Sequence, residues 1–207
     1  MASIFFPTII PHWIFIFPKF ACVNPFIIYF YFIFRKPINE LFSEFEGKDF
    51  EDESIDGDVK YHLGFTTYKT LRNNKKLKMN LVPNPSHLET VGAVVQGITR
   101  AKQDKDEITD ASQVLPIVVH GDAAIAGQGL VYEVVQMAQL DGYKTNGTIH
   151  IVVNNQIGIT TNYLDGRSST YCTDVAKVTL SPVLHGLPVF PKLSTPSLDI
   201  WQTRHQD

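Results

Sequence analysis

Two amphipathic helices are the first elements that the hydrophobic pattern predicts. The first covers residues 37–47, where apolar side chains repeat at helical spacing between a proline and a glycine. The second begins near Asn84 and runs to about Lys102, with an apolar stripe at helical spacing: Leu88, Val91, Val95 and Ile98. Ser86 and Glu89 have the spacing of a capping box, so both are expected to cap this helix.

A strand–helix–strand unit is predicted in the second half of the chain. The segments 114–120 and 148–154 are apolar runs typical of buried parallel strands, and 130–140 has the pattern of a helix between them. The glycine-rich segment 121–129 is expected to form a loop after the first strand. The predicted fold class is therefore α/β, with a parallel sheet flanked by helices and ligands bound at the carboxyl edge of the strands.

The first 34 residues differ in composition from the rest of the chain. They hold nine of the 14 phenylalanines and a single charged residue, Lys19. Prolines interrupt this segment, and its longest apolar run is shorter than the ~20 residues that a membrane helix needs. It also lacks the basic start and the cleavage site of a signal peptide. We interpret residues 1–34 as foreign to the domain that follows, with a membrane anchor as the less favoured alternative.

Charge and cysteine content exclude several classes of function. The formal net charge of −3 argues against binding nucleic acid, which requires a clustered excess of lysine and arginine. Cys22 and Cys172 lie far apart in unlike contexts, so neither a disulfide framework nor a zinc site is indicated. A reducing compartment is expected.

Polar residues follow both predicted strands. Asp122 follows the first strand after one glycine, and Asn155 comes directly after the second. Their oxygens and the main-chain carbonyl of Ile157 would leave three octahedral positions on Mg²⁺ for two diphosphate oxygens and a water. Asp122 alone would more often cap a helix or turn, but the pair of motifs predicts a magnesium–diphosphate site.

Four sequence blocks in one order resemble the thiamine-dependent first component of the 2-oxoglutarate dehydrogenase complex. The blocks are 57–64 around His62, 84–89, 120–129 and 154–158, and the similarity extends from about residue 33 to 185, including the segment at Arg167. The resemblance implies an incomplete thiamine diphosphate-binding α/β domain over residues 35–185. Residues 1–34 and the tail 186–207 are unlike the family.

The resemblance assigns metal and cofactor roles to residues of the two strand ends. Asp122, Asn155 and the carbonyl of Ile157 would hold Mg²⁺. Asp122 and Asn155 would also contact the cofactor, thiamine diphosphate, while Ala123 and Ala124 would lie along its diphosphate.

Three further residues are assigned to the substrate. Ser86 and Leu88 match positions that line the pocket of the cofactor and the 2-oxoacid, and His62 matches a histidine that contacts the substrate. His62 is the candidate catalytic residue, since an imidazole can donate to the oxoacid or move a proton. Without the surrounding motif, a surface imidazole would be the preferred interpretation of His62. We expect His87 to support the first helical turn and His120 to have no catalytic role.

The reaction implied is the oxidative decarboxylation of 2-oxoglutarate, with transfer of the succinyl group to a lipoyl group of the dihydrolipoamide succinyltransferase component. The intact family member is expected to be a homodimer in the bacterial cytoplasm or the mitochondrial matrix, with no role in binding nucleic acid or membranes. Alternatives are a 2-oxoglutarate decarboxylase, a 2-oxoadipate dehydrogenase relative, or an inactive remnant that binds magnesium and diphosphate.

The isolated chain is expected to be inactive. Residues 23–30 form a Phe/Ile-rich run where the family carries a histidine and an arginine that serve the active site. The family's second thiamine domain is also missing from these 207 residues.

Overall fold

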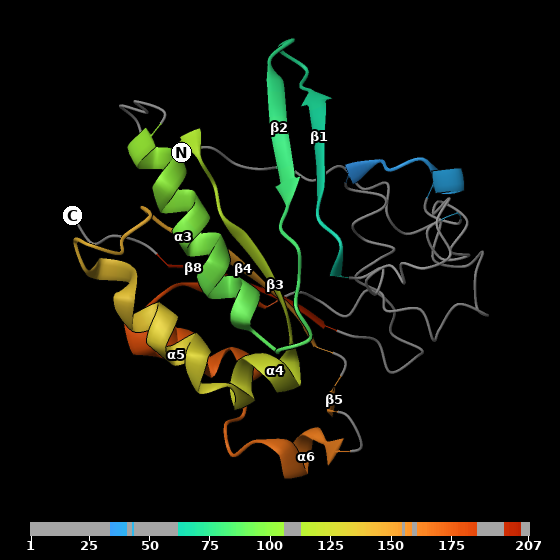
Figure 1. The fold of residues 1–207 in the computed structure, drawn as a ribbon. Coiled ribbons are helices and arrows are strands. Elements are labelled where there is room, and N and C mark those ends of the chain that lie inside the picture. The colour runs from blue at the N-terminus through green and yellow to red at the C-terminus, as the bar shows by residue number, and fades with distance from the viewer. Residues whose placement is uncertain are drawn as a thin grey trace, which may run out of the picture. The chain divides into compact units, whose positions relative to one another are not determined.

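The computed structural model describes residues 34–40, 43, 62–105, 113–154, 156–158 and 161–185, and the backbone of 197–203 (Figure 1). The chain divides into two compact units, Met1–Asn84 and Pro85–Asp207, which are described separately. The border between them falls inside the segment expected to be one domain. The divisions predicted near residues 34 and 185 remain predictions. None of the helices in the described ranges is long and apolar enough to cross a membrane.

The first unit contains a β-hairpin. Strand β1 (Phe65–Thr70) pairs antiparallel with β2 (Lys76–Leu81), with Phe65 opposite Leu81. Asn74 has a positive φ of 61° in the turn, a conformation that asparagine tolerates better than most residues. Residues 38–40 and 43 are helical, and the rest of the helix predicted over 37–47 lies outside the described residues.

The second unit is built on a four-stranded sheet of order β3-β4-β8-β7. Strands β3 (Ile117–Gly121) and β4 (Thr148–Asn154) are parallel, as predicted, with Ile117 opposite Ile149. Strand β3 begins three residues later than the predicted start at residue 114 and ends one residue later, at Gly121. Strand β8 (Ser197–Thr203) pairs antiparallel with both β4 and β7 (Val183–His185). The α/β class is therefore confirmed, but the sheet is mixed, because a strand from the tail joins it.

Helices connect and flank these strands. They are α3 (Thr90–Lys105), α4 (Asp122–Gly127), α5 (Gly129–Gln136), the 3₁₀ turn η5 (Met137–Gln139), the single-turn α6 (Tyr163–Gly166) and the 3₁₀ helix η6 (Cys172–Thr179). The expectation of a loop over 121–129 was wrong, because most of this segment forms α4. Alanines between the glycines have high helix propensity, and an acidic first residue suits a helix amino terminus. A two-residue strand β5 (Ile157–Gly158) pairs with β6 (Thr161–Asn162).

The start of α3 also differs from the prediction. The helix begins at Thr90, whose backbone N–H and hydroxyl both donate to the His87 carbonyl, at 3.3 and 2.6 Å. Glu89 adopts a positive φ of 67° just before the helix, and its carboxylate binds His120 instead of capping backbone groups. The predicted capping box of Ser86 and Glu89 was therefore wrong.

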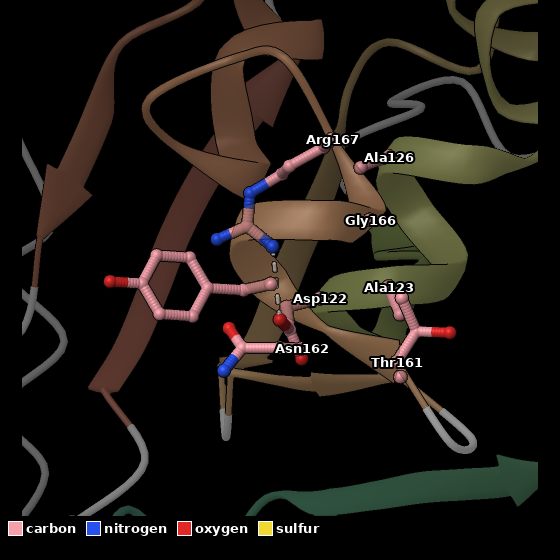
Figure 2. A pocket seen from close by; sticks show the side chains of 9 residues that line it. Asp122, Ala123, Ala126, Thr161, Asn162, Gly166 and Arg167 are labelled. Carbon is pink, nitrogen blue, oxygen red and sulfur yellow. Dashed lines mark hydrogen bonds and ion pairs between the residues drawn. The ribbon is translucent and has the colours of Figure 1, made fainter.

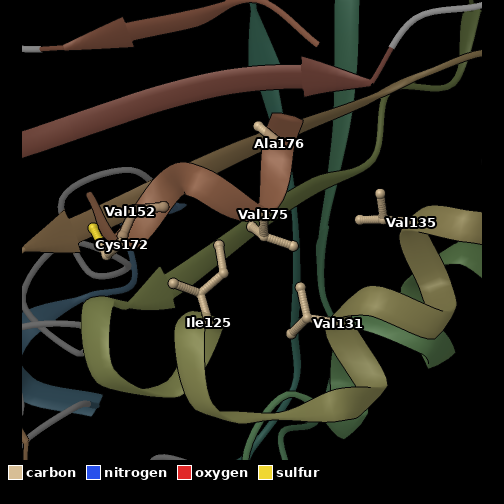
Figure 3. Close-up of a cluster of buried hydrophobic side chains, with 7 residues drawn as sticks. All are labelled: Ile125, Val131, Val135, Val152, Cys172, Val175 and Ala176. Carbon is tan, nitrogen blue, oxygen red and sulfur yellow. The ribbon is translucent and has the colours of Figure 1, made fainter. Parts of the chain in front are cut away.

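The hydrophobic core of the second unit lies around α4, α5, η6 and β4. Figure 3 shows its seven buried side chains: Ile125, Val131, Val135, Val152, Cys172, Val175 and Ala176. Ile125 and Val152 are fully buried, and each such side chain contributes roughly 1.5–3 kcal/mol by leaving water. Because Ile125 belongs to the same short helix as Asp122, the core fixes the position of that carboxylate.

Candidate functional site

A buried ion pair lies at the carboxyl end of β3. Asp122 is the first residue of α4, and Arg167 follows α6. The Nη1 of Arg167 donates to the Oδ2 of Asp122 over 3.1 Å, and their side chains are only 8% and 3% exposed (Figure 2). The fold thus places one carboxylate and one guanidinium side by side, away from bulk water.

The ion pair forms part of the wall of a cavity of about 210 Å³. The other lining residues come from α4 and from the segment containing β5, β6 and α6: Ala123, Ala126, Gly158, Thr161, Asn162, Tyr163 and Gly166. A Cβ at Gly158 would lie 3.4 Å from the Cβ of Ala123. This is an ordinary van der Waals distance, so β5 lies in direct contact with α4 at this point.

Arg167 has a donor that the structure leaves unused. Its Nε is buried and has no hydrogen-bond partner among the described residues. The guanidinium carbon lies 5.6 Å from the centre of the Tyr163 ring, a cation–π distance that holds the group over the aromatic face. Since buried donors are nearly always paired, the described residues leave the hydrogen bonding of this guanidinium incomplete.

The chemistry of this cavity suits a ligand that contains both signs of charge. A carboxylate oxygen is a ligand that Mg²⁺ prefers, and a guanidinium binds phosphate oxygens. The described residues contain no group of three or more histidine, cysteine, aspartate or glutamate side chains that could hold a metal. The predicted magnesium ligands include only one such residue, Asp122, beside an amide and a main-chain carbonyl.

The structure brings only some of the predicted cofactor residues to this cavity. Asp122 and Ala123 line it, whereas Ala124 does not, and the Ala124 carbonyl accepts from Gln128 within the helix end. Asn155 lies outside the described residues. Ile157 contributes its backbone to β5 opposite Asn162, and its side chain is not described.

The predicted substrate residues are not among those that line the cavity. Ser86 and Leu88 lie in the exposed segment before α3, and the Leu88 side chain is 56% exposed. His62 belongs to the first unit, where its carbonyl accepts from the Asn84 N–H over 2.9 Å. The roles assigned to these three residues remain predictions.

A buried chain of three ionisable side chains was missed by the sequence analysis. His120 Nδ1 donates to Glu89 Oε2 over 2.6 Å, and His120 Nε2 shares a hydrogen bond of 2.9 Å with His150 Nδ1. The two imidazoles stack with centres 5.2 Å apart. Burial, and then the charge of His120, lower the pKa of His150 well below its ordinary value. The signal in the sequence was a histidine at an inward position of each apolar strand.

Arg167 was also missed as a site residue. It lies 45 residues beyond Asp122, so no local pattern joins the two. The only feature of the sequence that pointed to Arg167 was its place after a glycine, within a segment that resembles the family.

Comparisons with known proteins agree with these motifs. The model of the family described as dehydrogenase E1 component matches residues 16–186, starting ahead of the residue 33 that the motifs indicated. The chain is 49% identical over 156 residues to the mitochondrial 2-oxoglutarate dehydrogenase of Dictyostelium discoideum, covering 74% of this chain and 15% of that protein. It is 52% identical over 147 residues to the 2-oxoglutarate dehydrogenase E1 component of Azotobacter vinelandii, covering 70% and 15%.

A third relative has a broader name. The multifunctional 2-oxoglutarate metabolism enzyme of Mycolicibacterium vanbaalenii is 51% identical over 158 residues, covering 74% of this chain and 13% of that enzyme. The chain thus spans about one seventh of the length of the curated relatives it matches.

Proposed function

The chain belongs to the dehydrogenase E1 component family, and we propose that it forms the diphosphate-binding part of a 2-oxoglutarate dehydrogenase first component. The observation that carries this proposal is identity of about 50% to relatives named for 2-oxoglutarate, together with a buried carboxylate at the edge where the family motif predicts it. Because the chain spans a small part of those relatives, the complete reaction is proposed for the whole protein.

The cavity supports thiamine diphosphate as the cofactor. It offers a buried carboxylate for a hard cation and the guanidinium of Arg167 for an anion. Its volume of about 210 Å³ is smaller than the ~300–1,000 Å³ of pockets that enclose a whole ligand. We infer that these residues hold the diphosphate and its metal, and that other parts of the protein enclose the rings.

Magnesium would be held at the two strand ends. In this proposal the Asp122 carboxylate, the Asn155 amide oxygen and the Ile157 carbonyl bind Mg²⁺, and the backbone around Ala123 and Ala124 lies along the diphosphate. Asp122 is supported by its burial and by its place directly after β3. The helix α4 keeps it there through Ile125, which is fully buried in the core.

The remaining assignments concern the 2-oxoacid. Thiamine diphosphate supplies the carbon nucleophile and the electron sink that the decarboxylation of a 2-oxoacid requires. Ser86 and Leu88 would line the substrate pocket, and His62 would donate a hydrogen bond to the oxoacid or move a proton. The acceptor of the succinyl group would be a lipoyl-bearing dihydrolipoamide succinyltransferase, with the intact enzyme acting as a homodimer in the cytoplasm or the mitochondrial matrix.

The proposal is tested by calorimetric titration of thiamine diphosphate into the full chain in the presence of Mg²⁺. The Asp122→Ala variant should lose the binding, because it removes the only predicted carboxylate ligand of the metal. Glu133→Gln is a matched control, since it removes an exposed carboxylate from α5 in the same unit. Equal binding by the Asp122 variant and the wild-type chain would overturn the assignment of the site.

A further inference from the structure

We propose that Arg167 is a ligand of the cofactor's diphosphate, and that Asp122 and Arg167 divide the site into a cation side and an anion side. This inference rests on the proposed function, because it concerns the same cavity. It adds a residue to which neither the motifs nor the comparisons assign a role.

Most hydrogen-bond donors of Arg167 have no partner among the described residues. An arginine side chain has five N–H donors and no acceptor. In the described residues only the Nη1 of Arg167 has a partner, the Oδ2 of Asp122 at 3.1 Å. The Nε has none, although it is buried and the side chain is only 8% exposed. Buried donors are nearly always paired in folded proteins, so the described residues lack one hydrogen-bond partner that this guanidinium would be expected to have.

The guanidinium of Arg167 is held between a carboxylate and an aromatic ring on the wall of the cavity. The residue lines the cavity together with Asp122, and Figure 2 shows one terminal nitrogen of the guanidinium directed at the carboxylate. The Tyr163 ring supports the guanidinium, with 5.6 Å between the ring centre and Cζ. A planar, charged group that is held in place on the wall of a cavity loses little entropy when an anion binds it.

The charges of Asp122 and Arg167 suit a magnesium ion and a diphosphate together. Asp122 and Arg167 neutralise one another before a ligand arrives, so neither charge is buried alone. A diphosphate carries more negative charge than one Mg²⁺ neutralises. With Asp122 at the metal, the guanidinium supplies a positive charge for the remaining phosphate oxygens. The ion pair therefore holds both groups in place until the metal and the diphosphate bind.

Titration calorimetry with two probes, inorganic pyrophosphate and thiamine diphosphate, both with Mg²⁺, tests the proposal on the full chain. Arg167→Gln should weaken the binding of both probes about tenfold to a hundredfold, the usual effect of losing a hydrogen bond between charged groups. Arg167→Lys should fall between this variant and the wild type, because lysine keeps the charge but lacks the Nε and the planar fork. Arg100→Gln is the matched control, since it removes another arginine–aspartate pair, on α3, whose partly buried arginine also donates to two main-chain carbonyls and does not line the cavity.

Thermal unfolding without ligand accompanies each titration. If Arg167→Gln does not fold, Arg167→Lys decides the matter: weaker binding of both probes at an unchanged melting temperature supports the proposal. Wild-type affinity in either folded Arg167 variant overturns it.

The two probes also separate this inference from the proposed function. Pyrophosphate binding that depends on Arg167, without any binding of thiamine diphosphate, would support the anion site and overturn the thiamine assignment. Binding of thiamine diphosphate that is unaffected at Arg167 would overturn only the inference. A wild-type chain that binds neither probe would overturn both.

Discussion

Lowering the pH should destabilise the second unit through His150. This imidazole is 4% exposed in β4, in hydrogen-bond contact with His120, which in turn binds Glu89. Burial first, and the charge of His120 second, lower the pKa of His150 well below its ordinary value. The folded state therefore keeps His150 neutral at a pH where the unfolded chain binds a proton. The stability that this provides is present above the unfolded pKa of about 6.5 and is lost as the pH falls below it.

The size of the effect follows from one proton. Each pH unit below about 6.5 costs up to about 1.4 kcal/mol of unfolding free energy, until the folded pKa is reached. Between pH 7.5 and 5.5 the loss is therefore up to about 1.4 kcal/mol, since most of it accumulates in the lower unit. His150→Asn removes the titrating group while it keeps a side-chain partner in reach of His120.

Urea unfolding followed by circular dichroism at pH 7.5, 6.5 and 5.5 provides the measurement. Other groups titrate in both proteins, so the relevant quantity is the difference between the two pH slopes. The wild-type chain should lose up to about 1.4 kcal/mol more than His150→Asn over this range. Equal slopes, or a wild-type chain that gains stability toward pH 5.5, would refute the reasoning about the buried histidines.

Two further predictions concern the core and the chain as a whole. Ile125→Ala removes a fully buried side chain from α4 and should lower the unfolding free energy by about 2–5 kcal/mol, as measured by urea unfolding. The milder Ile125→Val should lower it by about 0.5–1.5 kcal/mol. A loss below about 0.5 kcal/mol for the alanine variant would show that α4 is not held by this core. The purified 207-residue chain with thiamine diphosphate and Mg²⁺ should release no CO₂ from 2-oxoglutarate, because the Phe/Ile-rich run 23–30 cannot supply an imidazole and a cation. Measurable turnover by the chain alone would contradict this.

The parts of the fold with strong local patterns could be predicted from the sequence. The run of apolar residues gave β4 over Thr148–Asn154 with the correct ends, and its parallel pairing with β3 followed from the helix between them. Strand β8 was missed, because its place in the sheet depends on pairing with β4, which is distant in sequence. The prediction of a loop over 121–129 was wrong because it gave the glycines more weight than the alanines between them. In the structure Asp122–Gly127 is helical.

The site shows the same limit. Asp122 could be proposed as a site residue because it lies just beyond a predicted strand and matches a motif. Its partner Arg167 could not, since only the folding of the segment around α6 brings the two together. Glu89 has the spacing of a helix cap, and nothing local indicates that its carboxylate binds His120, a residue 31 positions later. Local sequence patterns therefore do not reveal the partners of ionisable groups that meet only in the folded protein.

The central claim is that the edge of the sheet at Asp122 holds a metal-bound diphosphate. The most direct measurement is calorimetric titration of thiamine diphosphate into the wild-type chain, first with Mg²⁺ and then with the metal removed by a chelator. We predict saturable binding with one cofactor per chain in the presence of Mg²⁺ and its loss without the metal. Binding of equal strength without Mg²⁺, or no binding in either condition, would contradict the claim.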